Sequence, residues 1–206
     1  MGWYERFVVA PLIHTGMRHP DLKRLRARLV PQAQGRVLEI GIGSGHNLPL
    51  YGREVSHVIG IDPSKPLLER ARDQAQFARG DSTIELIHGG AERMPVDSAS
   101  IDTVVTTWSL CSVQDPRAVL GEAQRVLRPG GRLLFVEHGR SPDAAVQRWQ
   151  DRLDPAWTRL ASGCHINRPI TLLIEQTGLK LQTTEQGYLV SGPRVLTWHS
   201  LGAAVR

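Results

Sequence analysis

Short apolar segments alternate with amphipathic segments along most of the chain. Runs rich in leucine and β-branched residues predict strands at 36–40, 55–61, 84–88, 101–106 and 133–137. The segments between them predict helices at 47–51, 66–78, 116–127 and 144–160. Strands that alternate with helices form parallel sheets covered on both faces, so the pattern predicts an α/β fold.

The two ends of the chain depart from this alternation. Residues 1–30 are expected to be helical, with Trp3, Phe7, Val8 and Leu12 near one side and Pro20 at the start of a second helix. We expect this segment to form a lid over a ligand site, with Trp3 or Tyr4 near the ligand. At the other end, residues 180–185 and 194–200 predict an antiparallel pair.

Composition narrows the class of protein. A length of 206 residues without an internal repeat or a low-complexity linker predicts one domain, 1–206. The two cysteines do not make a disulfide framework and suit a reducing compartment. The longest apolar run, 7–13, is far too short to span a membrane, and no signal peptide is evident, so we expect a cytoplasmic protein.

The net charge of +5 leaves the kind of partner open. A basic balance permits nucleic acid or a lipid surface as a partner, although a solvated basic face is the ordinary interpretation. Few aromatic residues interleave with the early arginines, and no accessory RNA module is visible. We therefore expect no stable nucleic-acid partner and at most weak peripheral contact with a membrane.

A glycine-rich loop directly after the first predicted strand is the strongest candidate for a ligand site. Gly41, Gly43 and Gly45 alternate with other residues there. A dinucleotide fingerprint would place its third glycine where His46 stands, and no Gly-Lys-Ser/Thr of a P-loop follows. Asp62 ends the second strand, where a carboxylate can accept hydrogen bonds from a ribose. The pattern indicates a nucleoside without a pyrophosphate, and a tight turn without a ligand remains the alternative.

Four segments resemble the successive motifs of class I S-adenosylmethionine-dependent methyltransferases: VLEIGIGSGHN, VIGIDPS, GGAERMPVDSASIDTV and VLRPGGRLLFVE. The resemblance covers about residues 35–140. It implies S-adenosylmethionine as the cofactor and a Rossmann-like fold. We therefore expect a seven-stranded sheet of six parallel strands and one antiparallel strand, a helical lid at 1–30, a cofactor-binding core at 35–140, and a substrate-covering helix with terminal strands at 141–206.

The resemblance also assigns roles to residues. The three glycines of the loop would accommodate the methionine part of the cofactor, Asp62 the ribose and residues 90–92 the adenine, with Thr107 and Trp108 beside the methyl group. Many relatives carry Asp where this chain has Gly90, so Glu92 or backbone groups would have to replace that acceptor. The complete predicted cofactor set is Glu39, Gly41, Gly43, Gly45, Asn47, Asp62, Pro63, Gly90, Ala91, Glu92, Thr107 and Trp108.

A narrower resemblance concerns the acceptor. SLCSVQDP, FVEHGRS and LDPAWTRLASGCHINR are similar to the methyltransferase-like branch that includes alkyl-thiol methyltransferases. Bacterial quinone and phospholipid methyltransferases share the core motifs. The first expectation is therefore methylation of a small, apolar thiol. A phospholipid amine or a quinone-type acceptor is the alternative, followed by RNA methylation, non-catalytic cofactor binding and nicotinamide chemistry.

The candidate catalytic residues follow from the proton that each acceptor must lose. A thiol has only to become a thiolate, whereas an amine must be neutral and a ring carbon needs a stronger base. His138, at the end of the fifth predicted strand, and His165 are the candidate bases, and Trp157 is expected to line the pocket. Each also has an ordinary interpretation, as a polar loop residue or a packing aromatic. Cys164 and His165 fall short of a zinc site, so no metal is expected, and the oligomeric state stays open.

Overall fold

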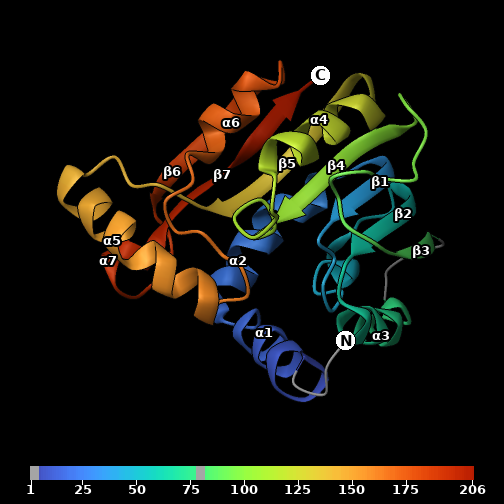
Figure 1. The fold of residues 1–206 in the computed structure, drawn as a ribbon. Helices are drawn as coiled ribbons and strands as arrows, with labels where there is room; N and C mark the ends of the chain where they lie inside the picture. Colours follow the sequence, from blue (N-terminus) through green and yellow to red (C-terminus); the bar gives the residue numbers. More distant parts are fainter. Residues whose placement is uncertain (1–4, 78–81) are drawn as a thin grey trace.

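The computed structural model describes residues 5–77 and 82–206, which form one seven-stranded sheet in the order β3-β2-β1-β4-β5-β7-β6 (Figure 1). Strand β7 runs antiparallel to both neighbours, β5 and β6, and the other neighbouring pairs are parallel. This confirms the Rossmann-like sheet of six parallel strands and one antiparallel strand. The strands are β1 (Gly35–Ile40), β2 (Val55–Asp62), β3 (Thr83–His88), β4 (Ile101–Thr107), β5 (Leu127–His138), β6 (Lys180–Tyr188) and β7 (Trp198–Val205).

The helical segments begin where the sequence supplies caps or proline. Asp115 accepts hydrogen bonds from the amides of Arg117 and Ala118 at the start of α4, and Asp143 caps α5 in the same way. The helices are α1 (Ala10–Gly16), α2 (Pro20–Leu29), α3 (Lys65–Ala75), α4 (Pro116–Val126), α5 (Ala144–Leu160), α6 (Ile170–Gln176) and α7 (Arg194–Thr197). A π-helical segment, η1 (Glu5–Val9), and two 3₁₀ turns, η2 (Val30–Gln32) and η3 (Leu48–Leu50), complete the helical elements described.

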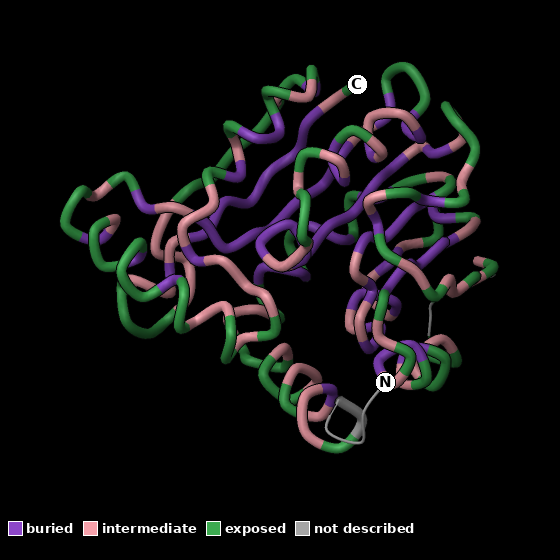
Figure 2. Tube along the Cα trace, viewed as in Figure 1, coloured by how far each residue is buried: buried purple, intermediate pink, exposed green. Residues whose placement is uncertain are grey.

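Helices cover both faces of the sheet. On one face, α4 and α6 bury Leu120 and Ile174 against strand residues such as Leu38 and Phe135. On the other face, α2 and α3 bury Leu25 and Leu68 against residues such as Val37 and Leu134. Figure 2 shows the result: the central strands are buried, while much of α5 is exposed. The central strands are therefore buried by an apolar layer on each face, which explains why apolar residues predominate in them.

Some expected elements differ from the structure. Residues 47–51 form only the short turn η3, because the backbone of Tyr51 is already extended, with ψ at 132°. The last strand begins at Trp198 and not at residue 194, since Pro193 is followed by the single helical turn α7. The helix expected at 66–78 ends at Ala75. Helix α6 was not predicted at all.

The predicted helical segment 1–30 consists of several pieces within its described part. Elements η1, α1 and α2 follow one another, with Met17 ending α1. The predicted apolar side is only partly covered, because Phe7 is 58% exposed and Leu12 66%. The expected position of Trp3 or Tyr4 near a ligand lies outside the described residues.

Neither a membrane-spanning helix nor a metal-binding cluster is present among the described residues. Among residues 5–77 and 82–206, no helix is both long enough and apolar enough to cross a bilayer. The same residues contain no cluster of three or more His, Cys, Asp or Glu side chains with a metal-binding arrangement.

Candidate active site

The glycine loop connects β1 to η3 at the carboxyl edge of the sheet. Gly41, Gly43 and Gly45 all have positive φ, at 67°, 55° and 76°, which favours glycine at each position. A Cβ atom on Gly41 would lie 2.1 Å from the Oγ atom of Ser109, whereas one on Gly43 would have no neighbour closer than 3.9 Å. Gly41 is therefore required by close packing. Gly43 instead leaves the backbone open on one side, which suits contact with a ligand.

Asp62 fixes the glycine loop to the end of β2. Its Oδ2 atom accepts a hydrogen bond of 2.9 Å from the amide of Gly43, and Oδ1 accepts one of 2.8 Å from the amide of Ser64. The carboxylate is 6% exposed. The backbone amide of Ser64, which follows Pro63, therefore helps to hold the Asp62 carboxylate at the edge where doubly wound sheets bind ligands.

A buried network connects Glu39, Asn47 and Thr107. The amide nitrogen of Asn47 donates to Oε1 of Glu39 at 2.8 Å and to Oγ1 of Thr107 at 3.1 Å. The hydroxyl of Tyr51 donates to Oε2 of Glu39 at 2.7 Å. Burial raises the pKa of Glu39 to about 7, although the hydrogen bonds from Tyr51 and Asn47 oppose this. Within the described residues, Oδ1 of Asn47 is buried without a hydrogen-bond partner, so it suits a ligand with a donor group.

The segment after β3 borders a hollow of about 530 Å³. A Cβ atom on Gly90 would lie 2.7 Å from Oε2 of Glu92, so the Glu92 carboxylate lies beside the backbone of Gly90. Ala91 is buried in the core beneath it. The hollow is lined by Ile61, Ile87, His88, Gly89, Gly90, Arg93, Met94 and Pro95.

Trp108 follows β4 in a backbone conformation that is unusual for a large side chain. Its φ is 54°, and the guanidinium carbon of Arg26 lies 4.8 Å from the ring centroid. Arg26 is buried on α2, and burial lowers its pKa to about 10. The indole nitrogen of Trp108 is buried and has no hydrogen-bond partner in the described part of the chain. No sequence signal pointed to Arg26, since it is one of many arginines in a polar helix.

Glu137 organises the loop that follows β4, and the sequence analysis missed this role. Its carboxylate accepts hydrogen bonds from the Thr106 hydroxyl at 2.7 Å and from the amides of Ser109 at 3.0 Å and Cys111 at 3.3 Å. Complete burial raises its pKa to about 7. A signal existed, since Glu137 is an acid near the end of an apolar strand, as Glu39 is.

His138 ends β5 and lies in a cluster with both cysteines. Its Nδ1 atom is 3.7 Å from Sγ of Cys164, which in turn is 3.6 Å from Sγ of Cys111. The His138 ring stacks on that of His199 with centroids 5.2 Å apart. Among the described residues, Nε2 of His138 is buried and lacks a hydrogen-bond partner. His138 is therefore the candidate base whose second nitrogen remains for an acceptor.

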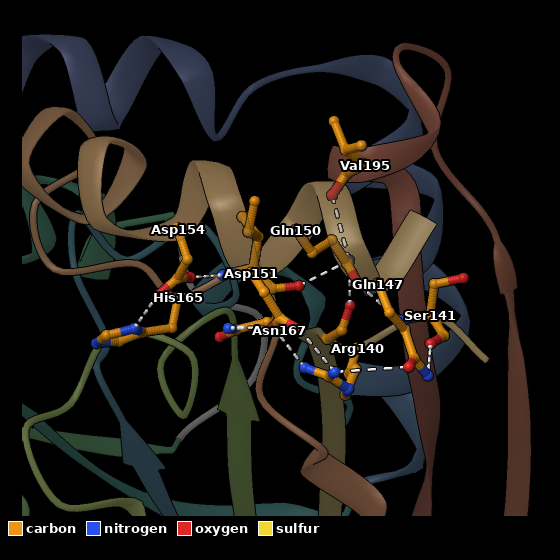
Figure 3. Close-up of polar contacts among 11 residues, drawn as sticks. Arg140, Ser141, Gln147, Gln150, Asp151, Asp154, His165, Asn167 and Val195 are labelled. Atoms are coloured by element: carbon orange, nitrogen blue, oxygen red, sulfur yellow. Dashed lines mark hydrogen bonds and ion pairs between the residues drawn. The ribbon is translucent and has the colours of Figure 1, made fainter. Parts of the chain in front are cut away.

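His165 lies beside this cluster but has a different partner. Its Nδ1 atom lies 2.8 Å from Oδ2 of Asp154 on α5 (Figure 3). Its backbone amide donates to the carbonyl of Cys111 at 2.7 Å. Oδ1 of Asp154 accepts a hydrogen bond from the amide of Ile166. Cys164 contacts His138 and not its neighbour His165, as expected for adjacent residues. Trp157 also lies near Cys164 and helps to lower the pKa of that thiol, and its buried indole nitrogen has no hydrogen-bond partner within the described residues.

Helix α5 is held over this edge of the sheet by one buried amide. The side-chain nitrogen of Gln150 donates to the carbonyls of Gly139, Ile166 and Val195, and its oxygen accepts from the amide of Ser141 (Figure 3). Gln150 is completely buried. These bonds connect α5 to the end of β5, to the loop that carries His165, and to α7.

The N-terminal helix contacts the glycine loop directly. Nδ1 of His14 and Oγ of Ser44 lie 2.9 Å apart, and Nε2 of His46 donates to the carbonyl of His14 at 3.1 Å. The two imidazole rings stack with centroids 4.8 Å apart. His46 thus ties the glycine loop to the backbone of α1. Figure 1 shows α1 and α5 on the side of the molecule where the β4 arrow ends.

Comparisons with known proteins agree with this geometry. Residues 38–135 match a family model described as a methyltransferase domain. The chain is 34% identical over 178 residues to thiol S-methyltransferase TMT1B of Rattus norvegicus, covering 82% of this chain and 70% of the relative. It is 36% identical over 129 residues to phosphatidylethanolamine N-methyltransferase of Cereibacter sphaeroides, covering 61% of this chain and 63% of the relative.

A solved structure supports the fold. Geranyl diphosphate methyltransferase in complex with SAM superposes with a TM-score of 0.70 at 17% identity, covering 100% of this chain and 91% of the other. The curated relatives, the matched domain and the sheet agree. The chain belongs to the S-adenosylmethionine-dependent methyltransferase family and is an enzyme of that class with a small-molecule acceptor.

Proposed function

We propose that this enzyme transfers the methyl group of S-adenosylmethionine to the sulfur atom of a small, apolar thiol. The observation that carries the proposal is the extent of the similarity to thiol S-methyltransferase TMT1B. That similarity covers 82% of this chain, well beyond the matched domain at 38–135, whereas the similarity to the phosphatidylethanolamine N-methyltransferase covers 61%.

The cofactor would lie along the carboxyl edge of the sheet. We assign its methionine part to the open backbone at Gly43 and to the unpartnered Oδ1 of Asn47, and its ribose to Asp62. Its adenine would occupy the hollow beside Gly90, with Glu92 as the acceptor for the amino group. When bound, the cofactor supplies an electrophilic methyl group on a sulfonium. The residues of the chain have to bind it, exclude water and align the acceptor.

His138 and Trp108 would form the acceptor side of the site. Nδ1 of His138 faces Cys164, so Nε2 is the nitrogen that an acceptor group would meet. Free cysteine thiols titrate at about 8.5, so a thiol supplies its own thiolate at mildly alkaline pH and needs orientation more than a strong base. A hydrogen bond between His138 and the acceptor suits that role, whereas a quinol or an amine would demand a base.

The pH dependence of the reaction tests this proposal. Initial rates would be measured for a series of alkyl and aryl thiols at subsaturating concentration, across a range of pH. We expect kcat/KM to rise with pH and to level off near the pKa of each thiol, so that the midpoint moves with the substrate. One midpoint shared by all thiols would instead indicate a titrating protein group and would contradict the proposed use of substrate thiolate.

We further propose weak contact between α5 and an anionic lipid surface, which would bring apolar acceptors to the site. Trp149, Leu153 and Leu160 lie at helical spacing on α5 and are 54%, 40% and 84% exposed. The exposed residues Arg148, Arg152 and Arg159 follow the same spacing beside them, which gives charge complementarity to an anionic surface. Sedimentation with vesicles tests this: binding to phosphatidylglycerol-containing vesicles that is lost in Leu153→Ser/Leu160→Ser supports it, and equal sedimentation of both proteins contradicts it.

A further inference from the structure

The two cysteines of the chain lie beside each other although they are 53 positions apart in sequence. Cys111 belongs to the loop between β4 and α4, and Cys164 to the loop after α5. Their sulfur atoms are 3.6 Å apart, and the amide of His165 donates to the carbonyl of Cys111 at 2.7 Å. The second contact holds the two loops together at the point where the sulfurs meet.

We propose that Cys111 and Cys164 form a thiol–disulfide exchange site, in which Cys164 attacks a small-molecule disulfide and Cys111 resolves the mixed disulfide. The division of roles follows from accessibility. Cys164 is partly exposed, so an external disulfide can reach it, whereas Cys111 is 1% exposed and can be reached only by a sulfur already inside the protein.

The surroundings favour Cys164 as the thiolate. The contact between the two sulfurs lowers the pKa of Cys164, burial opposes this, and the contact with His138 lowers the pKa further. The same contact, together with burial, raises the pKa of Cys111. The nearby Glu137 adds to this rise, because its charge repels a second anion.

A half-buried cation, Arg168, also lies beside the pair. Arg168 donates from Nη1 to the carbonyl of Leu110 at 2.6 Å, next to Cys111. Burial lowers the pKa of Arg168, and attraction to Cys111 and Cys164 opposes this. A partly desolvated guanidinium at this position stabilises negative charge on the attacking sulfur. Glu137 acts on Cys111, His138 contacts Cys164, and Arg168 interacts with both sulfurs, while Asp154 interacts with Arg168.

The chemistry balances without a metal or a further oxidant. The Cys164 thiolate attacks one sulfur of a disulfide RSSR, the S–S bond breaks, and the first RS⁻ leaves and takes a proton from water. The Cys111 thiol then loses its proton to solvent and attacks the Cys164 sulfur, which releases the second RS⁻. One small disulfide is thereby reduced to two thiols while one intramolecular disulfide forms. A dithiol reductant returns the protein to its starting state.

Closure of the disulfide would alter the acceptor side of the site. The two sulfurs have to approach by about 1.5 Å to reach bonding distance. Cys164 would then no longer be available to Nδ1 of His138 as a thiol or thiolate. The oxidation state of the pair is therefore coupled to the groups around His138. The exchange site itself does not depend on which acceptor the enzyme methylates.

The test uses the full chain, reduced and freed of reductant, with bis(hydroxyethyl) disulfide as the probe. After acid quenching, the mass of the intact chain is measured under denaturing conditions. We expect the unchanged protein to lose two hydrogen atoms, to carry no adduct and to release two equivalents of thiol. Because the chain contains no other cysteine, each product has a single assignment.

Two single variants separate the roles of the cysteines, with thermal unfolding as the control for folding. Cys111→Ser should stop at one stable mixed disulfide on Cys164, and Cys164→Ser should react at least tenfold more slowly than the unchanged protein. If a serine variant does not fold, the alanine variant replaces it. The mass of the unchanged protein and the amount of thiol released still test the proposal. Two adducts on one chain, no reaction, or equal rates for both variants would overturn the proposal.

Discussion

Nδ1 of His138 lies 3.7 Å from Sγ of Cys164, while Nε2 of the same ring is buried and lacks a hydrogen-bond partner within the described residues. One nitrogen therefore faces a protein sulfur, and the other remains for a ligand. His138 is therefore better placed to position an acceptor than to act as a strong base. No carboxylate hydrogen bond to His138 is found within the described residues, whereas His165 contacts Asp154.

Replacement of His138 tests that interpretation. For a thiol acceptor near pH 8, we expect His138→Ala to lower kcat/KM by less than about tenfold, far below the roughly 10²–10⁴-fold loss typical of an essential general base. His165→Ala, measured in parallel, should have an equally modest effect. A loss of a hundredfold or more in either variant, with unchanged folding, would identify that histidine as an indispensable base.

Asp62 should contribute strongly to cofactor binding. In Asp62→Ala the loop loses the acceptor for the Gly43 amide and the proposed partner of the ribose. We expect binding of S-adenosylmethionine or S-adenosylhomocysteine to weaken by about 2–3 kcal/mol, as measured by calorimetry. Asp73→Ala on the exposed side of α3 is the matched control and should bind normally. Equal or tighter binding of NAD to the unchanged protein would contradict the assignment of the cofactor.

The N-terminal segment is predicted to act as a lid, since His14 contacts both Ser44 and His46 of the glycine loop. We expect deletion of residues 1–14 to abolish turnover while the far-ultraviolet circular dichroism of the core persists. His14→Ala, which keeps the segment but removes the contact with Ser44, should retain more activity than the deletion. Full activity of the truncated protein would exclude a lid.

Glu39 should make the ligand-free protein less stable as pH rises. Burial raises the pKa of Glu39 to about 7, so the folded state retains a proton that the unfolded state has already lost. The contribution of Glu39 to the free energy of unfolding is fully present below about pH 4.3, its pKa in the unfolded state. It is lost as the pH rises through about 7. The free energy of unfolding, measured with urea, should decrease less between about pH 5 and about pH 8 in Glu39→Gln than in the unchanged protein. Burial also raises the pKa of Glu137, so the pH dependence of stability should be reduced in Glu39→Gln but not removed. Identical profiles for both proteins would contradict ionisation of Glu39.

The sheet was predictable because its central strands are covered on both faces. Strands such as β1 and β4 are therefore buried over most of their length and rich in leucine, isoleucine and valine, and the glycine loop follows β1 while Asp62 ends β2. Helices α6 and α7 escaped prediction, because seven and four residues are too few to establish a helical period. Their positions depend on packing against elements far away in the sequence.

One side of the candidate site could be predicted from the sequence and the other could not. The proposed cofactor side lies at strand ends and in one loop, so local motifs indicate it. Its acceptor side depends on long-range contacts: Cys111 with Cys164, and Arg26 with Trp108. Nothing in the local sequence around any of these residues indicates its partner. The position of Glu137 could have been noticed, because the sequence around it repeats the pattern at Glu39.

The identity of the methylated atom tests the central proposal most directly. The protein would be incubated with S-adenosylmethionine carrying an isotopically labelled methyl group and with matched acceptors: an alkyl thiol, the amine and alcohol of the same chain length, a quinol and a phospholipid amine. Products would be identified by mass spectrometry, with Asp62→Ala as the control for enzyme-dependent transfer. We predict a labelled methyl thioether as the main product. Labelled phospholipid or quinol with no thioether would contradict the thiol proposal.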